Sequence, residues 1–139
     1  MRCSRYAGSR AHLTPTDAKR ALFVVLARGD VCSANAYVAA DLTDLRLAFR
    51  NDDEAFASAV QATAQEIARA LASPDSWGRG LEHDLAGWRR SAFPPYDGSE
   101  ADLRLIFRAH GCHGVDVLSF GLLFHPDTSS IYHLAKARL

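Results

Sequence analysis

The spacing of the apolar residues changes along the chain, and this change is the strongest constraint on its fold. Between residues 33 and 72 the apolar side chains recur every three or four positions, as on one face of a helix. Between residues 103 and 120 they tend to alternate with other side chains, as in a strand. A chain whose helical patterns precede its strand patterns is typical of the α+β class.

The helical region divides into two adjacent helices. The first begins after Ser33 and carries one apolar stripe, made of Val38, Leu42, Leu45 and Phe49. The second follows the acidic segment 51–54, which suits a helix N-terminus, and Ser73-Pro74 ends it. Its apolar face consists of Phe56, Val60, Ala64, Ile67 and Leu71. Helices separated by only one or two residues form a helical hairpin, which we expect to pack on a sheet.

The strand patterns complete the predicted fold. Residues 21–27 (ALFVVLA) predict an N-terminal strand, since Gly29-Asp30 follows as a turn and the run is too short to span a bilayer. Residues 88–93, 103–109 and 115–120 predict a three-stranded antiparallel meander. The tail 129–139 fits either an edge strand or a terminal helix. We therefore predict an α+β fold: an N-terminal strand, a helical hairpin, then the meander, with the helices on one sheet face. Residues 1–20 are expected to form a flexible basic arm, and residues 21–139 a single domain.

Charge on the predicted sheet indicates an anion site. The 16 basic and 16 acidic residues cancel, but fourteen of the basic residues are arginines, whose planar guanidinium suits bidentate contacts with phosphate. Arg104 and Arg108 fall on the same face of one strand, about 13 Å apart at 3.3 Å per residue. Arg89 or Arg90 on the preceding strand can join them, giving a surface for phosphate. The alternative is that these are solvated positions paired with carboxylates, namely Asp97, Glu100, Asp102 or Asp116.

Other chemical signatures are weak. The three cysteines have no repeated spacing, which favours a reducing, cytoplasmic setting over a disulfide framework. Residues 110–113 (HGCH) contain three potential metal ligands, but no second cluster accompanies them, so we interpret the segment as a hairpin turn. The sequence has no glycine-rich phosphate loop, serine nucleophile elbow or paired-carboxylate motif. We predict neither a metal nor a cofactor.

The order of these features resembles the RelE/ParE superfamily of bacterial toxin–antitoxin toxins. The resemblance is carried by four short stretches in the second half of the chain: residues 81–89 (LEHDLAGWR), 102–108 (DLRLIFR), 115–121 (VDVLSFG) and 131–135 (IYHLA). With the helical hairpin before them, the similarity extends back to about residue 21.

The resemblance implies a function and a set of site residues. RelE-like members cleave mRNA on the ribosome by attack of a 2′-hydroxyl on the adjacent phosphate, whereas ParE-like members inhibit DNA gyrase. Arg104 matches the family's strand arginine, Arg89 or Arg90 its preceding basic residue, and Tyr132 its C-terminal tyrosine. His125 stands where members usually carry a basic residue after the glycine that ends the last strand.

From this resemblance we expect an mRNA endonuclease toxin. Its catalytic residues would be Arg104, Arg89, Tyr132 and His125, with Arg90 and Arg108 as phosphate or RNA contacts. Its partners would be mRNA on the ribosome and a cognate antitoxin bound in an apolar groove between the helices and the sheet, with no membrane involved. The alternatives are a non-hydrolytic ParE-like gyrase inhibitor, a degenerate toxin that retains only antitoxin binding, and an α+β domain with no toxin activity.

Overall fold

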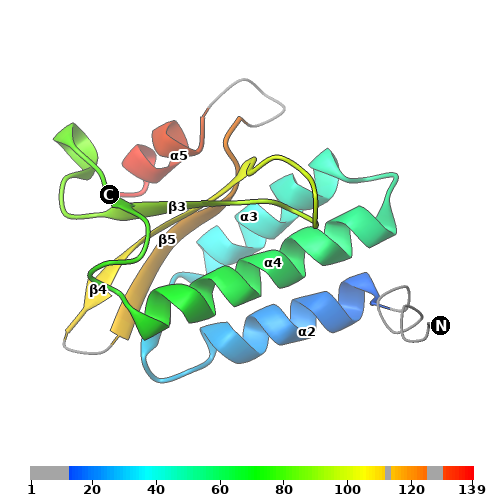
Figure 1. Cartoon of the computed structure of the whole chain (residues 1–139), viewed down its shortest axis with the longest axis horizontal. Helices are drawn as coiled ribbons and strands as arrows, with labels where there is room; N and C mark the ends of the chain where they lie inside the picture. Colours follow the sequence, from blue (N-terminus) through cyan, green and yellow to red (C-terminus); the bar gives the residue numbers. More distant parts are fainter. Residues whose placement is uncertain (1–12, 112–113, 125–129) are drawn as a thin grey trace.

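A computed structural model describes residues 13–111, 114–124 and 130–139 of the chain. Over these residues the protein is an α+β fold in which a five-stranded mixed sheet has helices on both faces (Figure 1). The elements in chain order are α2 (Pro15–Leu26), β1 (Val31–Ser33), α3 (Asn35–Ala48), α4 (Asp53–Ala72), β2 (Arg79–Gly80), the 3₁₀ turn η1 (His83–Leu85), β3 (Arg89–Phe93), β4 (Leu103–His110), β5 (Gly114–Leu122) and α5 (Ile131–Ala137).

The sheet is larger than the predicted meander. Strands β3, β4 and β5 lie where alternation predicts strands, and they pair antiparallel with their neighbours in sequence. Two short strands extend them in the order β1-β5-β4-β3-β2, and β1 runs parallel to β5. The expectation of a purely antiparallel three-stranded unit is therefore corrected to a mixed sheet of five strands.

The predicted N-terminal strand over residues 21–27 is wrong, because residues 21–26 belong to helix α2 and Ala27 is its C-cap. Thr14 caps this helix, its hydroxyl accepting a hydrogen bond from the backbone N–H of Asp17 at 3.1 Å, and proline occupies the first turn. Ala18 and Leu22, four residues apart, are buried, whereas Phe23 and Val24 are exposed. The apolar run is thus the C-terminal half of an amphipathic helix, and residues 15–20 of the expected flexible arm are helical as well.

Helices α3 and α4 confirm the two helical stripes read from the sequence. The Asp52 carboxylate caps α4 by accepting from the backbone N–H of Ala55 at 2.9 Å. The close neighbour of α4 is α2 rather than α3, and α4 lies between the two in the helical layer (Figure 1). The predicted two-helix hairpin is therefore part of a three-helix layer.

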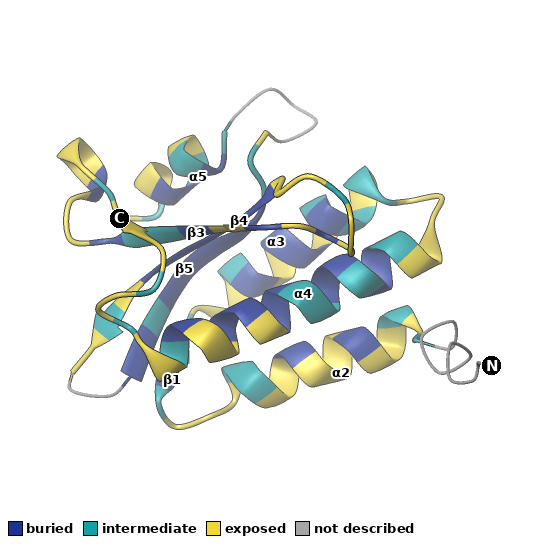
Figure 2. Ribbon diagram, viewed as in Figure 1, coloured by how far each residue is buried: buried dark blue, intermediate teal, exposed yellow. Residues whose placement is uncertain are grey.

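Both faces of the sheet are covered, which corrects the expectation that helices pack on one face alone. On β4, Leu103, Leu105 and Phe107 point to the core shared with α2, α3 and α4. Ile106 points to the opposite core, shared with α5. Of the two alternatives for the tail, an edge strand or a helix, the structure shows the helix α5. The strands between the two helical layers are mostly buried (Figure 2). None of the described helices has the length and hydropathy needed to cross a bilayer.

Candidate functional site

A pocket of about 450 Å³ opens on the α5 face of the sheet. It draws its lining from β3, β4, α5 and the loops beside them: Leu81, Glu82, Leu85, Arg90, Arg104, Leu123 and Tyr132. Three of the six residues expected from the sequence to form the site, Arg90, Arg104 and Tyr132, thus line one cavity.

Strand register explains why the two arginines share this cavity. Arg90 pairs with Ile106 across the β3–β4 ladder, and Arg104 lies two positions before Ile106 on the same strand. Directly opposite residues, and residues two apart on one strand, project to the same face of a sheet. Because Ile106 packs in the core beneath α5, both guanidinium groups emerge beside that helix.

The guanidinium of Arg104 is incompletely satisfied. Its Nη1 donates to the backbone carbonyls of Ala101 and Leu103, the latter at 3.0 Å. Its Nε is buried and has no hydrogen-bond acceptor among the residues that the structure describes. A buried cationic N–H without an acceptor is unfavourable, and a phosphate oxygen is a strong acceptor for it. Arg104 thus brings to the pocket a guanidinium whose Nε has no acceptor among the described residues.

A third arginine, which sequence reasoning missed, strengthens the positive charge at this edge. Arg79 on β2 lies directly opposite Arg90 on β3. Within the described ranges, no ion pair joins either guanidinium to a carboxylate. Like charges directly opposite each other destabilise a sheet, and a bound anion relieves that repulsion. The sequence does not predict this position for Arg79, because β2 has only two residues and so shows no alternating pattern.

Tyr132 and Glu82 supply the two groups of the pocket that can exchange protons. Tyr132 lies in the first turn of α5, which Ser130 caps by accepting from the backbone N–H of His133 at 3.3 Å. Glu82 is exposed and precedes η1 in the loop between β2 and β3. A carboxylate and a phenol are both competent general acids or bases. Glu82 was also missed, since a loop position carries no periodic signal.

Arg89 and Arg108 lie apart from the pocket lining. Arg89 points to the other sheet face, and its guanidinium donates to the backbone carbonyls of Trp77 at 2.7 Å and Gly78 at 3.1 Å. Arg108 pairs with Asp116 at 2.9 Å and stacks over the Trp88 ring, 4.3 Å from its centroid. For Arg108, the structure thus shows the alternative given in the sequence analysis, an arginine paired with a carboxylate. His125 falls outside the described residues.

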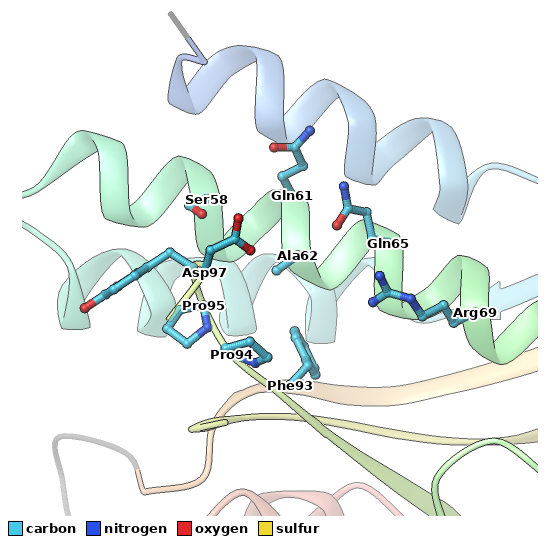
Figure 3. Close-up of a pocket in the computed structure, with 10 residues that line it drawn as sticks. Ser58, Gln61, Ala62, Gln65, Arg69, Phe93, Pro94, Pro95 and Asp97 are labelled. Carbon is cyan, nitrogen blue, oxygen red and sulfur yellow. The ribbon is translucent and has the colours of Figure 1, made fainter. Parts of the chain in front are cut away.

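A second, larger groove of about 660 Å³ lies on the opposite side of the sheet, between α4 and the segment that follows β3 (Figure 3). One wall is the polar side of α4, with Gln61, Gln65 and Arg69, and the other is apolar, with Phe93, Pro94 and Pro95. Its size suits a peptide segment better than a reaction centre. Tyr96 and Asp97 also line the groove, but Arg69 is the one cation among its described lining residues, so it offers no cluster of cations for a phosphate. The smaller pocket is therefore the better candidate for chemistry.

Comparison with known proteins gives no family assignment. No protein-family model matches the chain, and neither a curated protein nor a solved structure is significantly similar to it.

Proposed function

We propose that this protein is a RelE-like toxin that cleaves mRNA on the ribosome, with the pocket beside α5 as its active site. The observation that carries the proposal is the shared pocket of Arg90, Arg104 and Tyr132, which come from three separate elements. The same residue types are those that the RelE-like resemblance implies.

The reaction assigns a role to each side of the pocket. The ribose 2′-oxygen bonds to the adjacent phosphorus while the bond from phosphorus to the 5′-oxygen breaks. Glu82 takes the proton from the 2′-hydroxyl, and Tyr132 gives a proton to the departing 5′-oxygen. Arg90 and Arg104 hold the phosphate oxygens and stabilise the negative charge that develops on them. Fixed donors aimed at such charge are usually the largest catalytic contribution, and removal of one costs about 10²–10³ in rate.

The test is induced expression in a bacterium with the 5′ ends of translated messages mapped. New ends clustered within codons support the proposal, and Arg104→Ala, Arg90→Ala and Tyr132→Phe should each reduce them about 10²-fold or more. Arg50→Ala is the matched control, because Arg50 is exposed in the turn between α3 and α4 and lies outside the pocket lining. Arg108→Ala should have a smaller effect, since its guanidinium is already paired with Asp116.

The same experiment separates the rival functions. Growth arrest with intact messages and an induced DNA-damage response would overturn cleavage in favour of gyrase inhibition. Absence of arrest would overturn both and leave a protein that retains only antitoxin binding or has no toxin activity.

The cognate antitoxin belongs to the same proposal. We expect one of its segments to bind the groove between α4 and the segment after β3, where Tyr96 is 49% exposed beside Pro94 and Pro95. A small open reading frame beside the gene is the natural source. Co-expression should restore growth, and Tyr96→Ala should weaken the complex without lowering cleavage.

A further inference from the structure

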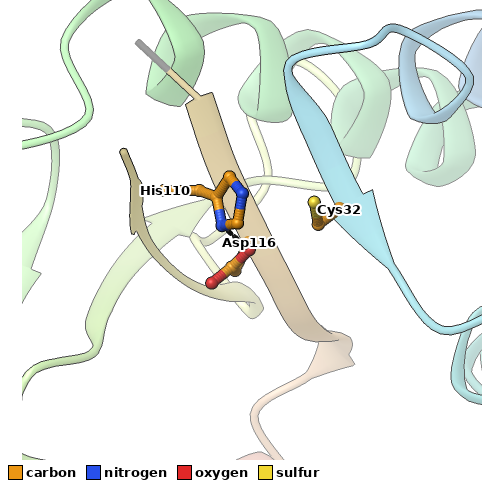
Figure 4. A group of neighbouring side chains, drawn as sticks. All are labelled: Cys32, His110 and Asp116. Atoms are coloured by element: carbon orange, nitrogen blue, oxygen red, sulfur yellow. Dashed lines mark ion pairs between the residues drawn. The ribbon is translucent and has the colours of Figure 1, made fainter. Parts of the chain in front are cut away.

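A second group of reactive side chains lies on the α5 side of the sheet, outside the pocket lining. Cys32, His110 and Asp116 come from β1, β4 and β5, and each offers one potential ligand atom within 4.8 Å of those of the other two (Figure 4). Cys32 and His110 are exposed, and Asp116 is half-buried. None of the three lines the pocket described above.

The register of three adjacent strands brings these residues together. Cys32 pairs with Asp116 across the parallel β1–β5 ladder, and Asp116 pairs with Arg108 across β4 and β5. His110 lies two residues after Arg108, so it projects to the same face. The sheet backbone therefore holds the three side chains side by side.

We propose that Cys32, His110 and Asp116 form a zinc-binding site. A thiolate, an imidazole and a carboxylate are all ligands that Zn²⁺ accepts, whereas Mg²⁺ and Ca²⁺ prefer oxygen ligands alone. Zn–N, Zn–O and Zn–S bonds of 2.0–2.3 Å place tetrahedral ligand atoms roughly 3.3–3.7 Å apart. The observed limit of 4.8 Å is thus about 1 Å wider, a difference that rotation of the exposed Cys32 and His110 side chains can close.

Asp116 is already oriented for this role. Its Oδ2 accepts from Arg108 Nε at 2.9 Å, and Arg108 is itself fixed over the ring of Trp88. Its Oδ1 lies 2.8 Å from Nδ1 of His110, which is a hydrogen-bond distance (Figure 4). Zinc would replace this contact, because two ligands of one tetrahedral zinc lie about 3.3–3.7 Å apart. Arg108 thus positions the carboxylate, as outer partners of metal ligands generally do.

Among the residues that the structure describes, the site has three protein ligands and a solvent-facing side. Zinc sites with three protein ligands complete their coordination with water or another small ligand. We therefore expect exchangeable zinc rather than a permanently enclosed structural ion. The site is independent of the proposed RNA cleavage, because no pocket residue is a ligand.

The experiment titrates the full chain with Zn²⁺ against a chromophoric chelator, and with Co²⁺ while recording the absorption spectrum. Cys3→Ser and Cys112→Ser form the background, so that a thiolate-to-cobalt charge-transfer band reports on Cys32. One zinc per chain is expected. Cys32→Ser, His110→Gln and Asp116→Asn should each weaken zinc by at least about 10-fold, and Cys32→Ser should also remove the band. His133→Gln, an exposed histidine on α5, is the matched control and should bind as the background does.

Two results would overturn the proposal. The first is absence of stoichiometric zinc binding in the unaltered chain. The second is zinc binding that disappears in the serine background or survives all three ligand substitutions, because the ion would then be held elsewhere. Circular dichroism of each variant separates loss of ligands from loss of the fold.

Discussion

Arg138, the C-cap of α5, forms two hydrogen bonds with the carboxylate of Asp41 on α3, at 2.7 and 2.9 Å. Neither side chain is open to solvent, with 6% and 1% exposed. Asp41 also accepts from the backbone N–H of Phe120 at 3.1 Å, and Arg138 donates to the carbonyl of Leu118 at 3.0 Å. The pair therefore ties α5 on one face of the sheet to a helix on the other face, through β5. Because Tyr132 is on α5, this ion pair also helps to hold Tyr132 in the pocket.

Removal of Arg138 should destabilise the fold strongly. Burial raises the pKa of the Asp41 carboxyl, and the hydrogen bonds and charge of Arg138 oppose that rise. In Arg138→Met the carboxylate loses its counter-ion, so we expect a loss of about 3–5 kcal/mol in the free energy of unfolding at neutral pH. Chemical denaturation followed by circular dichroism measures it.

The pH dependence of the stability lost in Arg138→Met tests whether the unpaired Asp41 carboxylate causes it. Without Arg138 the pKa of folded Asp41 rises further above its unfolded value, so the folded state binds the proton more tightly. The stability contributed by this proton is present below the unfolded pKa, about 3.9, and is lost as pH rises through the folded pKa. The deficit relative to wild type should therefore shrink from pH 7 toward pH 4. Asp41→Asn/Arg138→Met, which removes both charges, should show no such dependence; a deficit equal at both pH values in Arg138→Met would contradict the argument.

Arg79→Glu should strengthen the sheet and weaken the site. Glutamate opposite Arg90 replaces a repulsive cross-strand pair with an attractive one, which should raise the free energy of unfolding by about 0.2–1 kcal/mol. The same change removes a cation and adds an anion at the pocket edge, so RNA affinity by fluorescence anisotropy should fall. Arg79→Ala should give a smaller change in both quantities. A variant that loses stability while keeping its RNA affinity would mean that Arg79 does not face Arg90 across a shared anion site.

The sequence predicts those helices and strands of this fold in which the apolar pattern repeats over enough residues to be recognised. Helices α3 and α4 and strands β3, β4 and β5 each present one readable period. The contiguous apolar run 21–27 predicts a strand where helix α2 forms, because Thr14-Pro15 is a helix-start signal that outweighs strand propensity there. Strands β1 and β2 have three and two residues, too few for any period, and only their partners define them.

The alternating pattern within a strand predicts which site residues share a sheet face, and it predicts nothing more about the site. Alternation places Arg104 and Arg108 on one face, but whether Arg89 or Arg90 joins them depends on a register that the sequence does not reveal. Arg108 shares the face with Arg104 yet pairs with Asp116, which only the three-dimensional arrangement shows. In the group of Cys32, His110 and Asp116 the first and last members are 84 positions apart in the sequence, so no local spacing marks them as neighbours.

Trp77→Phe should destabilise the protein, because it removes a hydrogen-bond donor from the buried carboxylate of Glu66. The buried Glu66 carboxylate accepts from Trp77 Nε1 at 2.8 Å and from Arg69 Nη1 at 3.0 Å. Loss of the indole N–H leaves one buried oxygen without its donor, at a cost of about 1–3 kcal/mol. Urea denaturation measures the change. Glu66→Leu/Trp77→Phe removes both partners and should recover part of it, whereas an equal or larger loss in the double variant would show that packing, not the hydrogen bond, is responsible.

Gly114→Ala should detach β1 from the sheet and thereby weaken the proposed zinc site. A Cβ at Gly114 would lie 2.7 Å from the backbone oxygen of Asp30 and 2.9 Å from that of His110, and neither can move as a flexible side chain would. Asp30 accepts from the backbone N–H of Val115 at 2.8 Å, so the clash falls where β1 joins β5. We expect a loss of about 1–3 kcal/mol in the free energy of unfolding, as for other overpacked positions.

The matched control for this change is Gly29→Ala. A Cβ at Gly29 would meet no atom within 4 Å, so this substitution should alter the free energy of unfolding by less than about 0.5 kcal/mol. Zinc affinity should fall in Gly114→Ala, because Cys32 reaches Asp116 only through the β1–β5 ladder, and should stay unchanged in Gly29→Ala. If Gly114→Ala bound zinc as tightly as the unaltered chain while losing stability, the ligands would not depend on the pairing of β1 with β5, and the site would have to be sought on other residues.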